Sequence, residues 1–283
     1  MAKTDESQAD TSASTEITAV KTSSIVISDD DEFGGYAGQG MENVGVNDLL
    51  VPRLSIIQAL SPQLKQNKAE YIPDAKLGVI CDVGVGELFP NGVLFLPVYY
   101  RKDWLEWAPR STGKGLVAIH NDPSIMEQTK RDEKQRPIMP NGNLISETAQ
   151  FFGINLSAGR RKCFLPMAST QLRKARKWNL LATSEHLRRS NGTEFVAPLW
   201  YRSYMLTTAE ESNNEGDWAG WVINRAAAIK ELDLGYDWHT LKEEAISFRE
   251  AIIKGELKAD TSGMHGTSDG DVVDGSVGDE RAM

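Results

Sequence analysis

Basic side chains are concentrated in one short stretch of this chain, QLRKARKWNLL at residues 171–181. Guanidinium and ammonium groups at this density create a local positive potential that attracts the phosphates of a polyanion. Across residues 160–189, nine basic residues stand against one acid, Glu185, so the local balance is 9 − 1 = +8. The candidate phosphate contacts in this stretch are Arg160, Arg161, Lys162, Arg173, Lys174, Arg176 and Lys177.

Two other segments mix aromatic with basic residues. In PLWYRSYML, the alternation of a strand places Trp200, Arg202 and Tyr204 on one face. VYYRKDWLEWAPR shows a similar mixture on both of its faces. Exposed rings of this kind stack on unpaired bases, at about 1–3 kcal/mol each, while neighbouring cations meet the phosphates. The candidates from these segments and the residues that follow are Tyr100, Arg101, Lys102, Trp104, Arg110, Lys114, Trp200, Arg202 and Tyr204.

Each of these features also has a purely structural interpretation. Aromatic residues in strands most often fill a core, and basic helix faces often contact only water. The functional interpretation therefore depends on the joint occurrence of rings and cations.

The sequence lacks the common motifs for catalysis, nucleotide binding and metal binding. GVGELFPNG has no third glycine of a dinucleotide loop, GKGL lacks the spacing of a Walker loop, and no GxSxG elbow occurs. The four histidines show no ligand spacing, and Cys81 and Cys163 are too far apart in sequence for a zinc ribbon. We therefore expect a protein that is not an enzyme and that holds neither a metal nor a cofactor.

The net charge of -9 is distributed unevenly. Residues 1–48 hold two lysines against ten acids, and residues 256–283 hold two basic residues against seven acids, which predicts two disordered acidic tails. Subtracting -8 and -5 from -9 leaves +4 for residues 49–255, predicted to be one β-rich nucleic-acid-binding domain. The sequence has no apolar run of about 18 residues and no signal-like N-terminus, so we expect a cytoplasmic protein without membrane contact.

The elements that must position these residues are mostly strands. Short apolar runs separated by Pro, Gly and Asn predict strands at 51–59, 77–82, 92–101, 103–108, 116–120, 149–156, 161–168, 199–207 and about 218–224. Capping residues and helical spacing predict helices at 122–132, 169–182 and 238–254. In the second helix, Leu172, Ala175 and Trp178 share one face, and the four cations cover the other.

A basic β-rich body with strand aromatics and an acidic C-terminal tail resembles the single-stranded-DNA-binding proteins that bacteriophages encode for replication and recombination. The resemblance lies in VPRLSIIQALSPQL followed by FLPVYYRKDWLEW, and in FLPMASTQLRKARKW followed by the aromatic strand, within about residues 50–205. It implies a mainly β (α+β) fold: an OB-like barrel with added helices and disordered termini. It also implies that the tail contacts replication proteins, although this chain ends in DERAM, whereas such tails commonly end in an aromatic residue.

The leading hypothesis is a sequence-tolerant single-stranded-DNA-binding protein that acts in phage replication or recombination in the host cytoplasm. One alternative is a phage virion or assembly protein, in which the same aromatics form subunit contacts. Another is a recombination mediator that anneals strands as a ring-like homo-oligomer. The sequence leaves all three open.

Overall fold

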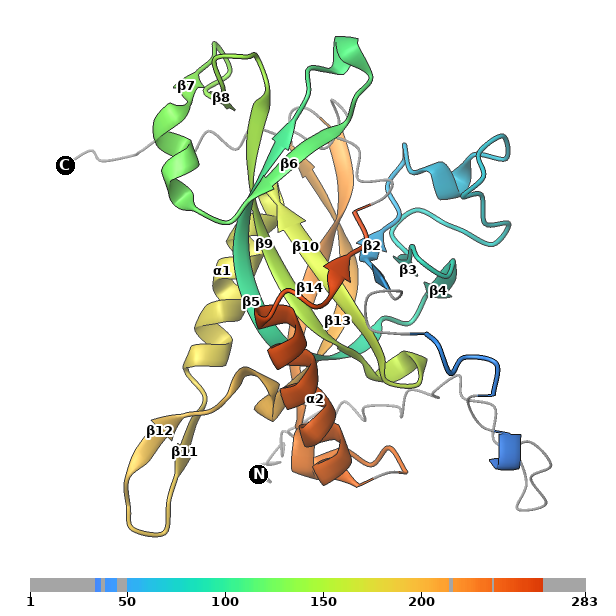
Figure 1. The fold of residues 1–283 in the computed structure, drawn as a ribbon, viewed down its shortest axis with the longest axis vertical. Coiled ribbons are helices and arrows are strands. Elements are labelled where there is room, and N and C mark those ends of the chain that lie inside the picture. The colour runs from blue at the N-terminus through green and yellow to red at the C-terminus, as the bar shows by residue number, and fades with distance from the viewer. Residues whose placement is uncertain (1–33, 37–38, 45–49, 214–215, 236, 262–283) are drawn as a thin grey trace, which may run out of the picture.

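A strongly curled antiparallel sheet forms the centre of the chain in the computed structural model, which describes residues 34–36, 39–44, 50–213, 216–235 and 237–261 (Figure 1). The sheet is a half-barrel that does not close. Six of its eight strands form the half-barrel: β5 (Val93–Trp107), β6 (Leu116–His120), β9 (Leu144–Asn155), β10 (Arg161–Ala168), β13 (Arg202–Asn213) and β14 (Gly216–Ala228). They follow the order β14-β13-β5-β9-β10, and β6 pairs with the far end of β5.

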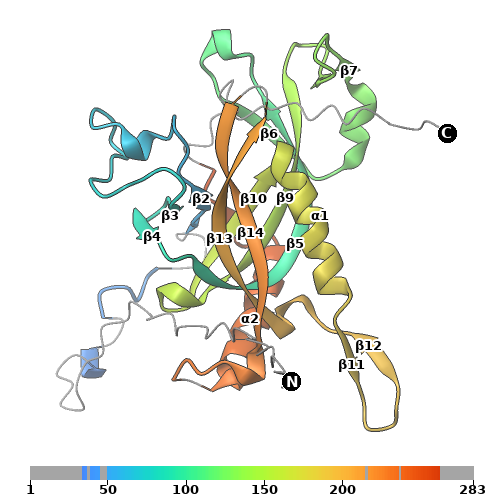
Figure 2. The same cartoon turned by 180° about the vertical axis from the view of Figure 1, so that it is seen from behind.

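Helices cover both faces of this sheet. The helix α1 (Leu172–Thr183) lies on one face, and α2 (Trp238–Ile253) lies on the opposite face, as the two views in Figures 1 and 2 show. Residues 148–155 of β9 are consecutively buried, which is the pattern of a strand whose two faces are both covered. The side chains of β9 therefore enter two separate cores in alternation.

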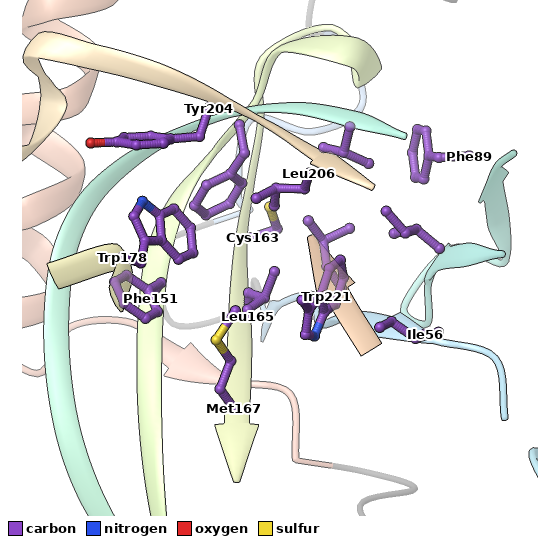
Figure 3. Close-up of a cluster of buried hydrophobic side chains, with 14 of the residues drawn as sticks. Ile56, Phe89, Phe151, Cys163, Leu165, Met167, Trp178, Tyr204, Leu206 and Trp221 are labelled. Carbon is purple, nitrogen blue, oxygen red and sulfur yellow. The ribbon is translucent and has the colours of Figure 1, made fainter. Parts of the chain in front are cut away.

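The first core joins α1 to the sheet through aromatic rings. Trp178 is fully buried and stacks on Phe151, with the ring centroids 4.0 Å apart (Figure 3). Tyr204 of β13 meets the same indole edge-on at 5.3 Å. A small antiparallel sheet of β2 (Leu54–Ile56), β3 (Ile80–Asp82) and β4 (Glu87–Phe89) adds further residues to this core. The amphipathic pattern of α1 is thus explained by the burial of its Trp178 face.

The second core lies between α2 and the other face of β5, β9 and β10. Leu241, Ala245, Phe248 and Ile252 are buried there at helical spacing, together with side chains such as Phe152. The helix begins at Asp237, whose side chain accepts a hydrogen bond from the backbone N–H of His239 at 3.1 Å. It is followed by Gly255 in the left-handed region, with φ of 72°.

The remaining described elements are short. The strands are β1 (Leu50–Val51), which pairs in parallel with β15 (Lys258–Ala259), β7 (Lys130–Arg131), β8 (Pro137–Ile138), and the hairpin of β11 (His186–Arg188) and β12 (Glu194–Val196). The 3₁₀ helices are η1 (Gly34–Tyr36), η3 (Pro62–Leu64), η4 (Arg110–Thr112), η5 (Pro123–Gln128), η6 (Leu156–Ala158), η7 (Ser169–Gln171), η8 (Leu199–Tyr201) and η9 (Ile229–Glu231). No helix in the described part of the chain is long and apolar enough to cross a membrane.

The prediction of a mainly β chain with added helices is confirmed, and of the expected OB-like barrel the structure shows a curled half-barrel that does not close. Among the described residues, β14 pairs with β13 alone. The α1 segment lies along β14 instead: Gln171 Oε1 accepts a bond from Trp221 N at 3.1 Å, and Arg225 Nη2 donates to Leu181 O at 2.6 Å. The position that a closing strand would need is therefore partly filled by a helix.

Several predicted elements differ in detail. The two strands expected at 92–101 and 103–108 are one strand, β5, because the buried Asp103 is paired with Arg101 and does not interrupt it. The helix expected at 122–132 is the short η5 followed by β7; of the η5 residues only Ile125 is buried, so a longer helix has no apolar face to pack. The predicted tails lie mostly outside the described residues, although β15 falls within the second one.

Candidate nucleic-acid interface

Three cations project from the outer face of α1. Arg173, Arg176 and Lys177 are exposed, whereas Ala175 and Trp178 are buried on the other side of the helix. The Arg176 side chain is 72% exposed, and one of its nitrogens lies 3.9 Å from Glu147 Oε1. In the described part of the chain, Arg173 and Lys177 form no ion pair. We call these three residues the α1 basic face.

An exposed leucine lies on the same side of the helix. Leu180 follows Lys177 by three residues and Arg176 by four, which places the three side chains next to one another. It is 68% exposed. A large apolar side chain surrounded by cations can contact sugars or bases while the cations bind phosphates.

The β11–β12 hairpin continues the chain beyond α1 and projects away from the sheet (Figures 1 and 2). Arg188 and Arg189 are both exposed on it, and the Arg189 guanidinium lies 4.7 Å from the centroid of the Phe195 ring. Neither arginine was among the predicted contacts, although both contribute to the +8 balance of residues 160–189. The hairpin extends the positive surface past the end of α1.

The fourth cation of the helix is neutralised by a neighbour. Lys174 points toward the β13–β14 ribbon, where its Nζ forms an ion pair with Glu211. Lys102 of β5 is likewise paired, at 2.9 Å, with Glu147 of β9. Both predicted contacts lie near the α1 basic face, but their charges are largely balanced.

The predicted cluster at residues 160–162 lies elsewhere. Arg160 pairs with Glu244 of α2 at 3.1 Å, and Arg161 pairs with Glu87 at 2.6 Å and with the buried Asp82 at 3.1 Å. Burial raises the pKa of Asp82, and the bond from Arg161 counteracts part of that rise. Arg161 and Lys162 begin β10, whereas η7 and α1 follow its other end, about 23 Å away at 3.3 Å per residue.

Lys162, at the same end of β10, is exposed and has its Nζ 5.6 Å from the centroid of the Phe248 ring. The cations counted together in sequence therefore form two surfaces, of which the one at residues 160–162 is mostly paired.

The exposed aromatic row expected at 200–204 is absent. Residues 199–201 form η8, so strand alternation begins only at Arg202. Tyr204 is 1% exposed in the first core, and burial raises its pKa. Arg202 donates hydrogen bonds to both oxygens of Glu185, at 3.0 and 2.7 Å, so its guanidinium has a structural role. Trp200 is half-buried against the second core.

The aromatics of β5 are also structural. Trp104 is 8% exposed and packs with Ile125 and Ile145. Tyr100 is half-buried, with its ring centroid 5.0 Å from that of Phe151. The expectation that Trp104 is available to stack on a base is wrong for the same reason as for Tyr204: both faces of this sheet are covered.

The remaining predicted cations are distant from α1 or paired. Arg101 Nε lies 2.8 Å from Asp103 Oδ1. Arg110 is in η4, and Lys114 is exposed in the loop that follows, on the β5–β6 connection at the end of the molecule opposite the β11–β12 hairpin (Figure 1). Within the described ranges, no three His, Cys, Asp or Glu side chains are grouped so that they could hold a metal ion.

One comparison with known proteins identifies a family. The family model described as Pam3 phage gp34-like protein matches residues 21–258, which include α1, α2 and the whole half-barrel. Its description names a phage protein and no activity. No curated protein matches the chain, and no solved structure does.

Proposed function

We propose that the chain, which belongs to the family of Pam3 phage gp34-like proteins, binds single-stranded DNA without sequence preference. The observation that supports this best is the α1 basic face, where exposed cations are fixed on a helix whose opposite side is locked into the core by Trp178. The preference for a single strand comes from the resemblance to phage single-stranded-DNA-binding proteins. We further infer a non-enzymatic role in phage replication or recombination in the host cytoplasm.

The α1 basic face would hold the backbone of the strand. Arg173 and Lys177 are one helical turn apart, and the Arg176 guanidinium can present two N–H groups to one phosphate. Leu180 would then contact the sugars or bases beside them. Contacts to phosphate position a strand but do not read its sequence, so binding of this kind is sequence-tolerant.

This arrangement differs from binding inside an OB-type barrel. The sheet faces are occupied by α1 and α2, and Tyr204 and Trp104 are in cores. An OB-type relationship of the half-barrel is part of the proposal, with the strand running over the outer surface of α1 and toward the β11–β12 hairpin. Residues 49–255 would act as the binding domain.

The experiment is a titration of fluorescein-labelled oligo(dT) with the full chain, followed by fluorescence anisotropy at 50 and 200 mM salt. We expect binding at the lower salt, with a slope of log K against log salt of about -2, from three contacts at about -0.7 each. Quenching of intrinsic tryptophan is a poor readout, because Trp104, Trp107, Trp178 and Trp221 are buried. No binding of oligo(dT) or oligo(U) at 50 mM salt would refute the proposal.

A second candidate is a phage virion or assembly protein. The projecting β11–β12 hairpin favours it, because Val196 is 52% exposed there and could enter a neighbouring subunit. Sedimentation of the chain with and without oligo(dT) separates the possibilities. Assembly into large particles without DNA supports the second candidate, and a ring-sized complex that forms only with DNA supports strand annealing by a homo-oligomer.

A further inference from the structure

A pocket of about 210 Å³ lies beside β14, next to the η7 turn that precedes α1. Three segments line it: the chain at residues 53–58, the end of β10 with η7, and residues 218–221 of β14. Ile56 and Trp221 give it an apolar wall that belongs to the first core (Figure 3). Trp218 is half-buried and forms another part of the wall. Side chains of the folded core therefore form part of the pocket wall.

One half-buried cation, Arg53, lines this pocket. The backbone of Arg53 is fixed, since its carbonyl accepts a hydrogen bond from Val83 N at 2.9 Å and the preceding carbonyl, of Pro52, accepts one from Phe164 N at 2.9 Å. The Arg53 Nε is buried without a hydrogen-bond partner. Burial lowers the pKa of this guanidinium and the charge of Asp260 partly restores it, but an arginine remains protonated at neutral pH in either case.

Arg53 differs from the other partly buried arginines. Arg161 and Arg202 each have a carboxylate oxygen within 2.7 Å. Within the described residues, no carboxylate lies at ion-pair distance from Arg53. Asp260 acts on Arg53 only from beyond that distance. Because a partly desolvated charge without a directly paired carboxylate is unfavourable, a bound anion would stabilise this site.

Some of the other polar groups around the pocket already form hydrogen bonds within the chain, and others can donate to a ligand. The Gln58 amide exchanges two hydrogen bonds with the backbone of Ala219, at 2.7 and 3.0 Å. The Gln171 oxygen accepts the N–H of Trp221. These bonds hold the rim rigid. The hydroxyls of Ser55 and Thr170 also line the pocket, and the Thr170 oxygen, which accepts a bond from Gln171 Nε2 at 3.4 Å, keeps its proton to donate.

The turn at the rim is also strained. Ser169 has φ of 50°, in the left-handed region that non-glycine residues rarely adopt. It redirects the chain from β10 into η7 and so brings Thr170 to the pocket. Strain of this kind is frequent at ligand sites, where the surrounding structure enforces it.

We propose that this pocket binds a small oxyanion, a phosphate or a carboxylate, through the Arg53 guanidinium. Its volume is below the roughly 300–1,000 Å³ of sites for drug-sized ligands, so only such a group and a short attachment fit. A guanidinium presents paired N–H groups that match the oxygens of either anion. The Trp218 ring also lines the pocket, and a flat group attached to the anion would pack against it.

The experiment is isothermal titration of the full chain with sodium phosphate, thymidine monophosphate and sodium acetate at constant ionic strength. We expect saturable binding of at least one of these oxyanions, weakened tenfold or more in Arg53→Gln and unchanged in Lys76→Gln, an exposed control that removes the same charge. Phosphate binding without acetate binding identifies a phosphate ligand, and the reverse identifies a carboxylate.

A second variant keeps the test decisive if Arg53→Gln fails to fold, which circular dichroism would show. Thr170→Val keeps the charge and removes one donor, and we expect it to weaken binding several-fold. Absence of binding of all three anions to the unmodified chain overturns the proposal. If Arg53→Gln folds and binds the anion as well as the unmodified chain does, the proposal is overturned. If Arg53→Gln does not fold, equal binding by Thr170→Val and the unmodified chain overturns it.

Discussion

Replacing Arg173, Arg176 and Lys177 together by glutamine should weaken binding of single-stranded DNA about 100-fold at 0.1 M salt. Each phosphate contact on a single strand contributes a slope of about -0.7, so three contacts contribute about 2.1 decades between 1 M and 0.1 M salt. The slope of log K against log salt should become less negative by about 2. The assay is anisotropy of labelled oligo(dT) at four or more salt concentrations.

Folding should survive this substitution. All three side chains are exposed, and glutamine has nearly the helix propensity of arginine and lysine. Removing like charges at positions 173 and 177 also relieves a repulsion across one turn. We therefore expect the free energy of unfolding to change by less than about 1 kcal/mol, measured in urea.

The matched control is Lys65, Lys68 and Lys76 changed to glutamine. These three lysines are also exposed and lie between β2 and β3, so the control removes the same net charge from another surface. It should weaken binding less than threefold. Equal losses in the two triple variants would mean that net charge, and not the α1 basic face, determines affinity, and this would refute the reasoning.

Three further predictions concern the fold. Gly153→Ala should destabilise the protein by about 1–3 kcal/mol in urea unfolding, because a Cβ there would overlap the backbone and a ring of the neighbouring strand β5; an unchanged midpoint would contradict the packing of β9 on β5. Glu185→Gln should cost stability at pH 7 and progressively less as the pH falls below about 4.3: the hydrogen bonds from Arg202 lower the pKa of Glu185, so its contribution is complete above the unfolded pKa of about 4.3 and is lost as pH falls through the lower folded value. Cys81 and Cys163 should not react with a thiol reagent at pH 8 until the chain unfolds, because burial raises the pKa of Cys81 to about 12 and that of Cys163 well above its usual value; rapid reaction of the native chain would show that these thiols are accessible.

Local periodicity predicted the elements that have one exposed and one buried side. The helix expected at 169–182 is η7 followed by α1, and its Leu172, Ala175 and Trp178 face does pack on the sheet. The strand expected at 116–120 is β6, in which half-buried and exposed side chains alternate. The strand expected at 161–168 is β10, although both of its faces are buried. In these cases, the spacing of apolar residues within one element contained the information.

The exposure of the aromatic residues could not be predicted in the same way. Alternation in a strand indicates which side chains share a face, but not whether that face is covered. Tyr204 and Trp104 share faces with polar residues in sequence, and both are nevertheless buried, because α1 and residues of η5 pack over them. The covering elements lie tens of residues away in sequence.

Charge counting failed for a related reason. The sum over residues 160–189 counts Arg161 as a free cation, but its partners Asp82 and Glu87 precede it by 79 and 74 residues. Lys174 is likewise balanced by Glu211. A local sum sees neighbours in sequence, whereas ion pairs depend on neighbours in space. The part of the prediction that remains is the α1 basic face.

A small interface has a consequence for how such a protein would hold DNA. Three phosphate contacts give only modest affinity at physiological salt, because their contribution decreases by about 2 decades for each decade of salt. Tight binding would then require several copies side by side on one strand, each adding its α1 basic face at high effective concentration. The β11–β12 hairpin follows the C-terminal end of α1 and projects away from the sheet (Figure 1), and we expect it to contact the next copy. A salt slope near -2, together with an affinity that rises strongly with oligonucleotide length, would therefore indicate cooperative association. A steeper slope on a short oligonucleotide would indicate that one chain uses more cations than those of α1.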